Sequence, residues 1–246
     1  MRIYCLSCES LARPVYLWAA HSPHIVDVEL VERGLHKPEE IRGRLQAKID
    51  AADGNGYDAI ALAFGLCGGT TAGLAARSIP LVLPRAHDCI TLYLGSRLRY
   101  TQEVTKEPGT YWYAQDYIER NSGGTAALAM GQGTAADMQS LYEHYVRKYG
   151  KTRADKLMEV MVGWLNQYKR GVYLDTGLGD DGDVKAQAQG EAERRGWVFE
   201  RIAADLDLLR RLLDGGWDDD FLVIPPGEQI AMAFDEGIVE VERPHP

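Results

Sequence analysis

The sequence predicts an α/β protein with two Rossmann-like lobes, each built on a parallel sheet, and a helical connecting segment between them. Short apolar runs alternate with amphipathic segments in the first hundred residues, and the same order returns near the C-terminus. Strands that alternate with helices in this way are typical of parallel sheets. Residues from about 126 to 167 have a helical pattern instead. We therefore expect an N-terminal lobe over residues 1–100, a mainly helical connection over 101–168 and a C-terminal lobe over 169–246.

The N-terminal lobe is expected to contain four strands. Residues 57–64 and 79–83 are almost entirely apolar, as expected of strands that are buried on both faces. Residues 25–31 alternate between apolar and acidic side chains, which is typical of a half-exposed strand. Residues 2–7 form a further short apolar run. Together these four runs predict one sheet.

Helices are expected between these strands. Residues 10–20 fit a helix if Pro14 lies in its first turn. Residues 39–51 and the short Ala-rich and Gly-rich segment 70–77 would form two more helices, and Asp88 would cap another. The chain thus alternates strand and helix throughout the first lobe.

The C-terminal lobe repeats this alternation. Strands are expected at residues 171–175, 197–202 and 221–224, because each segment is short and largely apolar. Helices are expected over residues 184–195 and in a segment that Asp205 caps.

Composition excludes several classes of function. The chain of 246 residues carries a net charge of -9, which argues against nucleic acid or an anionic membrane as the main partner. Its apolar runs are all shorter than the about 20 residues that cross a bilayer, and its N-terminus lacks the apolar stretch of a signal peptide. We therefore expect a cytoplasmic protein that acts on a small molecule. In that compartment its cysteines are expected to be thiols or metal ligands.

Three cysteines each follow a predicted strand. They are Cys8, Cys67 and Cys89. In a parallel sheet these residues emerge at the carboxyl edge, where open α/β sheets bind ligands. Three convergent thiols indicate a metal or an iron–sulfur cluster. Cys5 lies within the first strand instead, and it is expected to be a small core residue.

Glycines surround the second of these cysteines. Gly65, Gly68 and Gly69 allow close approach of a bound group to the backbone, so Gly68 and Gly69 are candidate substrate contacts. The helix expected after Cys67 would lower the pKa of its thiol. A phosphate-binding loop with an incidental cysteine is the alternative. It would not be a Walker loop, because no Gly-Lys-Ser/Thr follows.

Polar side chains accompany the third cysteine. Arg85 and His87 precede it, and a His-x-Cys pair can supply two zinc ligands. We expect Arg85, His87 and Glu9 to be catalytic or to contact the substrate. Asp175 and Glu228 follow strands of the second lobe, and they would hold substrate across a cleft between the lobes. They fit ordinary turns equally well.

Taken together, these motifs resemble one family. The segments that carry the resemblance are Cys8-Glu9, Gly65-Leu66-Cys67-Gly68, Pro84-Arg85-Ala86-His87-Asp88-Cys89-Ile90, Leu94-Gly95-Ser96 and Pro108-Gly109-Thr110-Tyr111. The chain is similar, from Cys8 to about Gly227, to domain-of-unknown-function family 1638 of bacteria and archaea. The resemblance implies cysteines at the three strand ends and not at Cys5, with asparagine commoner than glycine at Gly69. It implies no activity, but it implies a gene neighbourhood with corrinoid-dependent methyltransferases.

Three hypotheses remain open. The first is an enzyme that holds an open [4Fe-4S] cluster by Cys8, Cys67 and Cys89, in one-carbon, methyl-transfer or sulfur metabolism. Its architecture would be similar to that of other multi-lobed α/β enzymes with a three-cysteine cluster, including quinolinate synthase. The second is a zinc-dependent thiol alkyl- or methyltransferase that uses His87 and is linked to corrinoid proteins. The third is a non-enzymatic accessory protein for a metal or a corrinoid partner. The cluster is favoured, because three single thiols from three strands fit it. A corrinoid protein or methyltransferase is the candidate partner, and an oligomer is compatible with the sequence.

Overall fold

A computed structural model of the chain describes residues 1–32, 38–120, 142–143, 145–165 and 167–243. It divides the chain into two compact units. Unit 1 contains residues 1–100 and 204–246, and unit 2 contains residues 101–203. Among the helices that the structure describes, none combines the length and the apolar character needed to cross a membrane.

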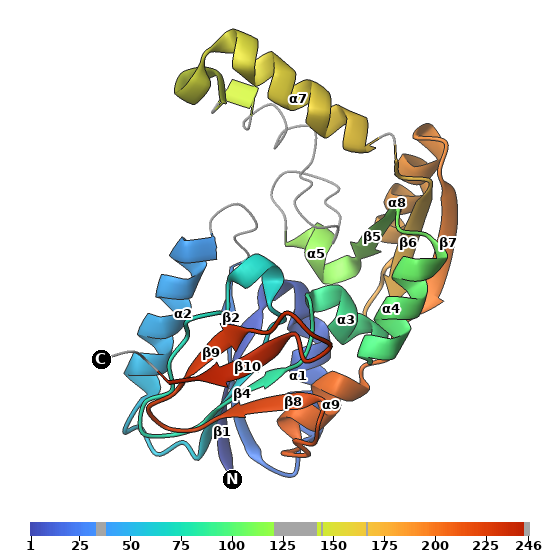
Figure 1. Cartoon of the computed structure of the whole chain (residues 1–246). Coiled ribbons are helices and arrows are strands. Elements are labelled where there is room, and N and C mark those ends of the chain that lie inside the picture. Colours follow the sequence, from blue (N-terminus) through green and yellow to red (C-terminus); the bar gives the residue numbers. More distant parts are fainter. Residues whose placement is uncertain (33–37, 121–141, 144, 166, 244–246) are drawn as a thin grey trace. The chain divides into compact units, whose positions relative to one another are not determined.

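Unit 1 is built on a five-stranded sheet (Figure 1). Its strands are β1 (Arg2–Cys8), β2 (Ile25–Val31), β3 (Ala59–Ala63), β4 (Leu81–Pro84) and β8 (Phe221–Ile224). Their order is β2-β1-β3-β4-β8, in which the first four are parallel and β8 runs antiparallel to β4. The central strand β3 is buried along its whole length, and the edge strand β2 is half-exposed, as its alternating sequence predicts. The predicted α/β fold is therefore confirmed.

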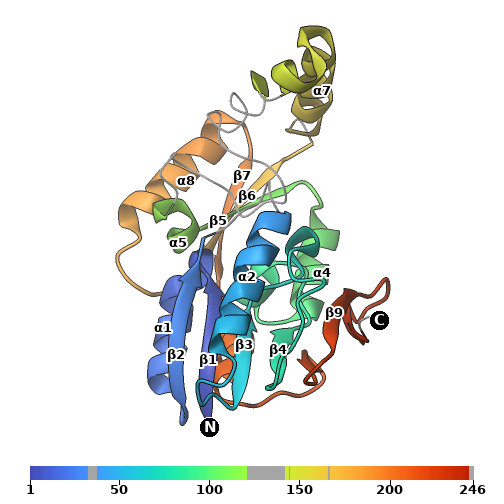
Figure 2. The ribbon, with the colours of Figure 1, turned by 90° about the vertical axis from the view of Figure 1, so that its left-hand side faces the viewer.

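Helices cover both faces of this sheet (Figure 2). The helices of unit 1 are α1 (Ala12–His21), α2 (Pro38–Ala52), α3 (Cys89–Leu94) and α9 (Asp207–Leu213), and α4 (Arg97–Lys106) runs from unit 1 into unit 2. Helices α1 and α9 pack against each other on one face, and α2 lies on the other. Asp88 caps α3 as predicted, because its carboxylate accepts hydrogen bonds from the backbone amides of Ile90 and Thr91.

The segment 70–77 differs from its prediction, because it contains no helix. Its backbone pairs instead with the C-terminal hairpin formed by β9 (Gln229–Met232) and β10 (Val239–Glu242). Ala75 forms an isolated antiparallel bridge with Gln229. Pairing with a strand that is distant in sequence has overridden the local preference of an Ala-rich segment.

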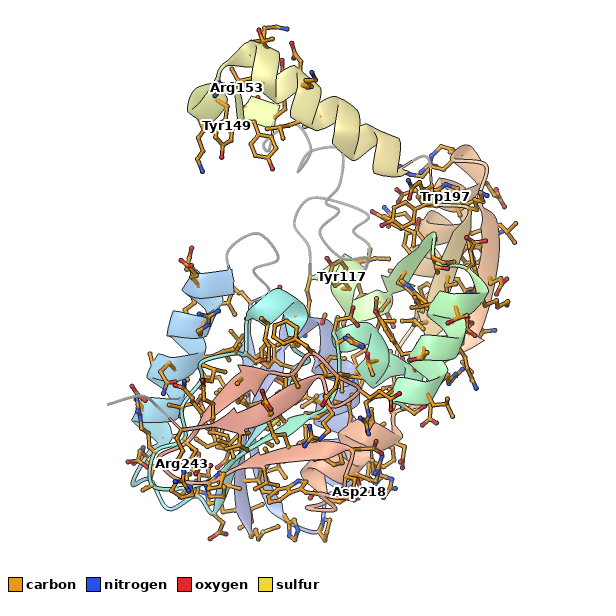
Figure 3. The ribbon with its side chains drawn as sticks, in the orientation of Figure 1. Tyr117, Tyr149, Arg153, Trp197, Asp218 and Arg243 are labelled. Carbon is orange, nitrogen blue, oxygen red and sulfur yellow. The ribbon has the colours of Figure 1, made fainter. Side chains whose placement is uncertain are left out.

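Unit 2 is built on a three-stranded parallel sheet in the order β5-β6-β7. Its strands are β5 (Thr110–Ala114), β6 (Arg170–Asp175) and β7 (Val198–Ala203), and its helices are α5 (Gln115–Glu119), α7 (Lys151–Leu165) and α8 (Gly182–Arg194). Aromatic side chains fill the core beside α8, and they include Tyr111, Tyr113, Tyr173 and Trp197. Figure 3 labels Trp197 in this part of unit 2.

The division of the chain differs from the predicted lobes at two places. Residues 110–114 form a strand of unit 2, so 101–168 is not simply a helical connection, although α7 confirms the helical pattern after Gly150. The rest of that pattern, over residues 121–141, lies outside the described residues. In addition, residues 204–246 belong to unit 1 and not to a second lobe over 169–246, because β8 pairs with β4 and α9 packs beneath β3 and β4.

Candidate functional site

The three cysteines that follow strands lie at one edge of the unit 1 sheet. Cys8 is the last residue of β1, Cys67 opens a 3-10 turn (Cys67–Gly69) after β3, and Cys89 is the first residue of α3 after β4. Strands β1, β3 and β4 are adjacent and parallel, so their carboxyl ends share an edge. The strand order reverses direction between β1 and β3, which is where ligands bind in open α/β sheets.

The three thiols are close enough to influence one another. Burial raises the pKa of Cys67, and the negative charges of Cys8 and Asp88 raise it further. Burial also raises the pKa of Cys89, with additional contributions from Asp88, Cys8 and Cys67. All three cysteines are free of disulfides, and Cys67 and Cys89 are partly exposed to solvent. The prediction that the three thiols share one edge is therefore confirmed.

The structure corrects the electrostatics predicted for Cys67. A helix after this residue was expected to lower the pKa of its thiol, but only the single 3-10 turn follows, and the pKa is raised. Burial and the neighbouring negative charges therefore outweigh any effect of backbone dipoles. Cys5 is completely buried in β1, as predicted, and burial raises its pKa to about 12.

Ser10 links two of the thiols, and the sequence reasoning missed it. Its hydroxyl donates a hydrogen bond to the Cys8 sulfur over 3.1 Å, and it offsets part of the rise in the pKa of the neighbouring Cys89 thiol. The phenol of Tyr93 donates in turn to the backbone carbonyl of Ser10. Ser10 is completely buried. The signal available in the sequence was a small hydroxyl residue two positions after a strand-end cysteine.

The backbone near Cys67 is tightly constrained. The amides of Leu66 and Cys67 donate to the carbonyls of Ala86 and His87, each over 2.8 Å, and so join the loop after β3 to the loop after β4. A Cβ atom on Gly65 would lie 2.6 Å from the backbone of Asp88. Cys67 itself has a φ of 49°, which is uncommon for a residue other than glycine. This geometry stores backbone strain at a thiol, as functional sites often do.

The polar residues beside Cys89 form a rim around the thiols. The ring of His87 lies against Tyr100, with 5.2 Å between the ring centroids, and the loss of water there lowers the pKa of the imidazole. Burial raises the pKa of Asp88 to about 6, and one oxygen of this carboxylate is buried without a hydrogen-bond partner among the described residues. Burial raises the pKa of Tyr100, and the nearby Asp88 and Cys89 raise it further.

Some predicted site residues lie elsewhere or have other partners. The Arg85 guanidinium donates to the backbone carbonyls of Gly237 and Val239 in the C-terminal hairpin. Asp175 ends β6 of unit 2 and forms an ion pair with Arg201. Glu228 lies in unit 1, in the connection between β8 and β9. Ile224, the last residue of β8, pairs with Leu81, the first residue of β4. The connection that contains Glu228 therefore begins at the edge of the sheet opposite the thiols.

The other predicted residues remain near the thiols. Glu9 directly follows Cys8 and opens a 3-10 turn. Gly68 is exposed, and a Cβ atom there would meet nothing within 4 Å. Gly69 is buried, and a Cβ atom there would lie 3.7 Å from the sulfur of Met232. Gly68 thus leaves open space next to Cys67, whereas Gly69 faces the hairpin.

The donor set suits a metal in its chemistry but is not arranged around a single ion. Within the described part of the chain, no group of three or more His, Cys, Asp or Glu side chains is placed to hold a metal ion. Cys8 nevertheless raises the pKa of both Cys67 and Cys89, and Cys67 raises that of Cys89, so the three thiols share one electrostatic environment.

A comparison with protein families identifies the chain. The model of a family described as a protein of unknown function, DUF1638, matches residues 30–213, which is more than half of the chain. The chain belongs to this family. The DUF1638 match includes Cys67 and Cys89, and Cys8 lies before its first matched residue. No curated protein and no solved structure matches the chain.

Proposed function

We propose that this DUF1638 protein is a metal-dependent enzyme whose Cys8, Cys67 and Cys89 hold a [4Fe-4S] cluster, and that it acts on a small molecule. The observation that carries the proposal is the arrival of three thiols, from three adjacent strand ends, at the point where the sheet order reverses. Four free cysteines fit a reducing cytoplasm, which belongs to the same proposal.

We prefer a cluster to a single zinc ion because three single thiols from three adjacent strand ends match its three protein ligands. Among the described residues no group of three or more His, Cys, Asp or Glu side chains is arranged to hold a metal ion, and this finding favours neither metal over the other. His87, the nitrogen donor of the zinc hypothesis, lies against the ring of Tyr100. A cluster of several irons is larger than one ion, so it can bridge thiols that are further apart.

The chain supplies the surroundings of the metal. A three-cysteine cluster leaves one iron open, which would serve as a Lewis acid or bind a substrate sulfur. The hydroxyl of Ser10 donates to the Cys8 sulfur and would stabilise its thiolate form. Cys67 and Cys89 are partly exposed, which gives a small molecule access to this edge. His87, whose pKa is lowered, would be neutral and able to accept a proton at the rim.

The metabolic setting belongs to the same proposal. We place the protein in one-carbon, methyl-transfer or sulfur metabolism, with a corrinoid protein or methyltransferase as partner. The support is the gene neighbourhood with corrinoid-dependent methyltransferases that the family resemblance implies. The acidic surface, with a net charge of -9, favours a small molecule or a protein as the partner over nucleic acid.

The test is metal and sulfide analysis of protein purified without oxygen, together with its visible spectrum, for the wild type and for Cys67→Ala. About four irons and four sulfides per chain, lost in the variant, are expected. About one zinc per chain without iron would overturn the cluster and favour a zinc enzyme that activates a thiolate for alkyl transfer. A protein without metal would overturn both assignments and leave the thiols as core or redox residues.

A further inference from the structure

The loop that carries Cys67 depends on neighbouring elements for its shape. We define the Cys67 loop as residues 66–76, which contain no helix or strand apart from the 3-10 turn and one isolated bridge. Helix α2 holds one side of it. Arg42 donates to the carbonyl of Gly69 over 2.8 Å, and the amide side chain of Gln46 bonds to both the N–H and the carbonyl of Ala75.

The C-terminal hairpin holds the other side of the Cys67 loop. The amide of Gly73 donates to the carbonyl of Ile230 over 2.7 Å, and the amide of Ile230 donates to the carbonyl of Leu74 over 2.9 Å. Further along β9, the sulfur of Met232 lies near Gly69. The hairpin therefore follows the loop from Ala76 to Gly69, the second residue after Cys67.

Two arginines anchor the tip of this hairpin, which we define as residues 233–238. Arg85 directly follows β4 and donates to the carbonyls of Gly237, over 3.0 Å, and of Val239. Arg97 donates to the carbonyl of Glu236 over 2.8 Å. Bonds from a charged donor are among the stronger hydrogen bonds in proteins. The tip is thus fixed to the strand end that precedes His87 and Cys89.

We infer that Arg85 is a positioning residue: by anchoring the β9–β10 hairpin, it holds the Cys67 loop in the conformation that brings Cys67 to the other two thiols. Cys67 has a positive φ of 49°, a conformation that persists only where the surroundings enforce it. The hydrogen bonds to Ala86 and His87 hold Cys67 from the loop after β4, and the hairpin and α2 constrain the rest of the Cys67 loop from two further sides. The inference rests on the proposed function only in treating Cys67 as a site residue.

The test compares Arg85→Gln and Arg85→Lys with the wild type, all without metal. Hydrogen–deuterium exchange of residues 66–76 and 229–242 reports the opening of the loop and of the hairpin. Alkylation by iodoacetamide, followed by mass spectrometry, reports the exposure of Cys67, with the buried Cys5 as internal reference. The matched control is Arg44→Gln, because Arg44 is exposed and makes only surface ion pairs with Glu32 and Glu40 among its described contacts.

In Arg85→Gln, the amides of residues 66–76 and 229–242 are expected to exchange about tenfold faster. The free energy needed to open these segments falls because a charge-assisted hydrogen bond is lost. Alkylation of Cys67 is expected to accelerate by a similar factor while Cys5 stays protected. Arg85→Lys should restore most of the protection, because an ammonium can still donate to a carbonyl. The control should match the wild type.

Faster exchange confined to the hairpin would overturn the inference, because the loop would then hold its shape without it. Unchanged exchange in both segments would overturn it as well. If Arg85→Gln does not fold, Arg97→Gln provides the same test at the hairpin tip. Metal content is measured separately on wild-type protein, so a chain without metal but with the expected exchange would reject the cluster and keep the positioning role.

Discussion

The two units contain parallel sheets whose strands end in polar loops, yet only unit 1 gathers its strand-end residues into a candidate site. In unit 1 the order β2-β1-β3-β4 reverses direction after β1, so neighbouring strands connect to helices on opposite faces. In unit 2 the described strands run in one direction, β5-β6-β7. A reversal separates the connections and opens a crevice at the carboxyl edge. A motif at a strand end therefore becomes a site through the topology around it.

The two carboxyl edges also differ in the surroundings of one strand-end carboxylate each. In unit 2, Asp175 pairs with Arg201 and accepts a hydrogen bond from the amide of Gly177 over 2.9 Å. In unit 1, Asp88 has a buried oxygen that meets no hydrogen-bond partner in the described part of the chain, and the nearby Cys67 and Cys89 have raised pKa values. Buried polar groups that lack hydrogen-bond partners are typical of a binding site, because a ligand can supply the missing interactions.

The largest effect that tests this comparison is the loss of metal. Cys8→Ser and Cys89→Ser should each lose nearly all bound iron, because each removes one of three cluster ligands. Cys5→Ala and Asp175→Asn should keep the metal content of the wild type, since Cys5 lies in the core and Asp175 belongs to unit 2. Iron and sulfide per chain are measured after purification without oxygen. Loss of iron in Asp175→Asn would break the comparison.

A smaller effect concerns the backbone at the two edges. Gly65→Ala should destabilise the protein by about 3 kcal/mol, because its Cβ would lie 2.6 Å from the backbone of Asp88, which cannot move aside as a side chain can. Gly177→Ala should cost about 1 kcal/mol, because the φ of 67° is unfavourable for alanine but the space is open. Urea unfolding followed by circular dichroism measures both. An equal loss of unfolding free energy in the two variants would show that the close contact between Gly65 and the Asp88 backbone does not contribute to stability.

The smallest effect is the pH dependence of an ion pair in unit 2. Arg170 is buried and lies 2.5 Å from Glu200, and this hydrogen bond holds the pKa of Glu200 below its usual 4.5. Glu200 therefore stabilises the fold above pH 4.5, and this contribution is lost as the pH falls through its folded pKa.

Glu200→Gln should accordingly lower the free energy of unfolding by about 1 kcal/mol or less at pH 7, because the carboxylate is about a third exposed. Below the folded pKa of Glu200 the variant and the wild type should unfold alike, because the carboxyl is then neutral in both states. Urea unfolding at several pH values measures this difference, with Glu240→Gln, an exposed residue of β10, as control. A difference that does not change with pH would point to lost packing in place of the charge.

Much of the fold followed from local pattern. The apolar runs that became β1, β3 and β4 predicted their own burial, and the cysteines after them predicted the shared edge, because both features depend only on short stretches of chain. The position of Cys5 in the core followed from the same reasoning. The metal itself stays a prediction.

The features that were missed depend on contacts between distant residues. No local signal shows that β8 returns to pair with β4, or that the 70–77 segment pairs with β9 instead of forming a helix. The aromatic run that became β5 is a strand because β6 lies beside it. Ser10 offered only the weak signal of a hydroxyl two residues after Cys8, and its role becomes visible once the fold brings Cys8 and Cys89 to it.

The discontinuity of unit 1 has a consequence for the order of synthesis. Its first hundred residues, which carry all the candidate thiols, leave the ribosome before unit 2 and long before α9, β8 and the C-terminal hairpin. The sheet therefore exposes one side of β4 until β8 has been synthesised, and the Cys67 loop lacks its hairpin until β9 and β10 follow. Because domains otherwise fold from the N-terminus as they emerge, the Cys67 loop acquires its final surroundings only once the C-terminal hairpin has also been synthesised.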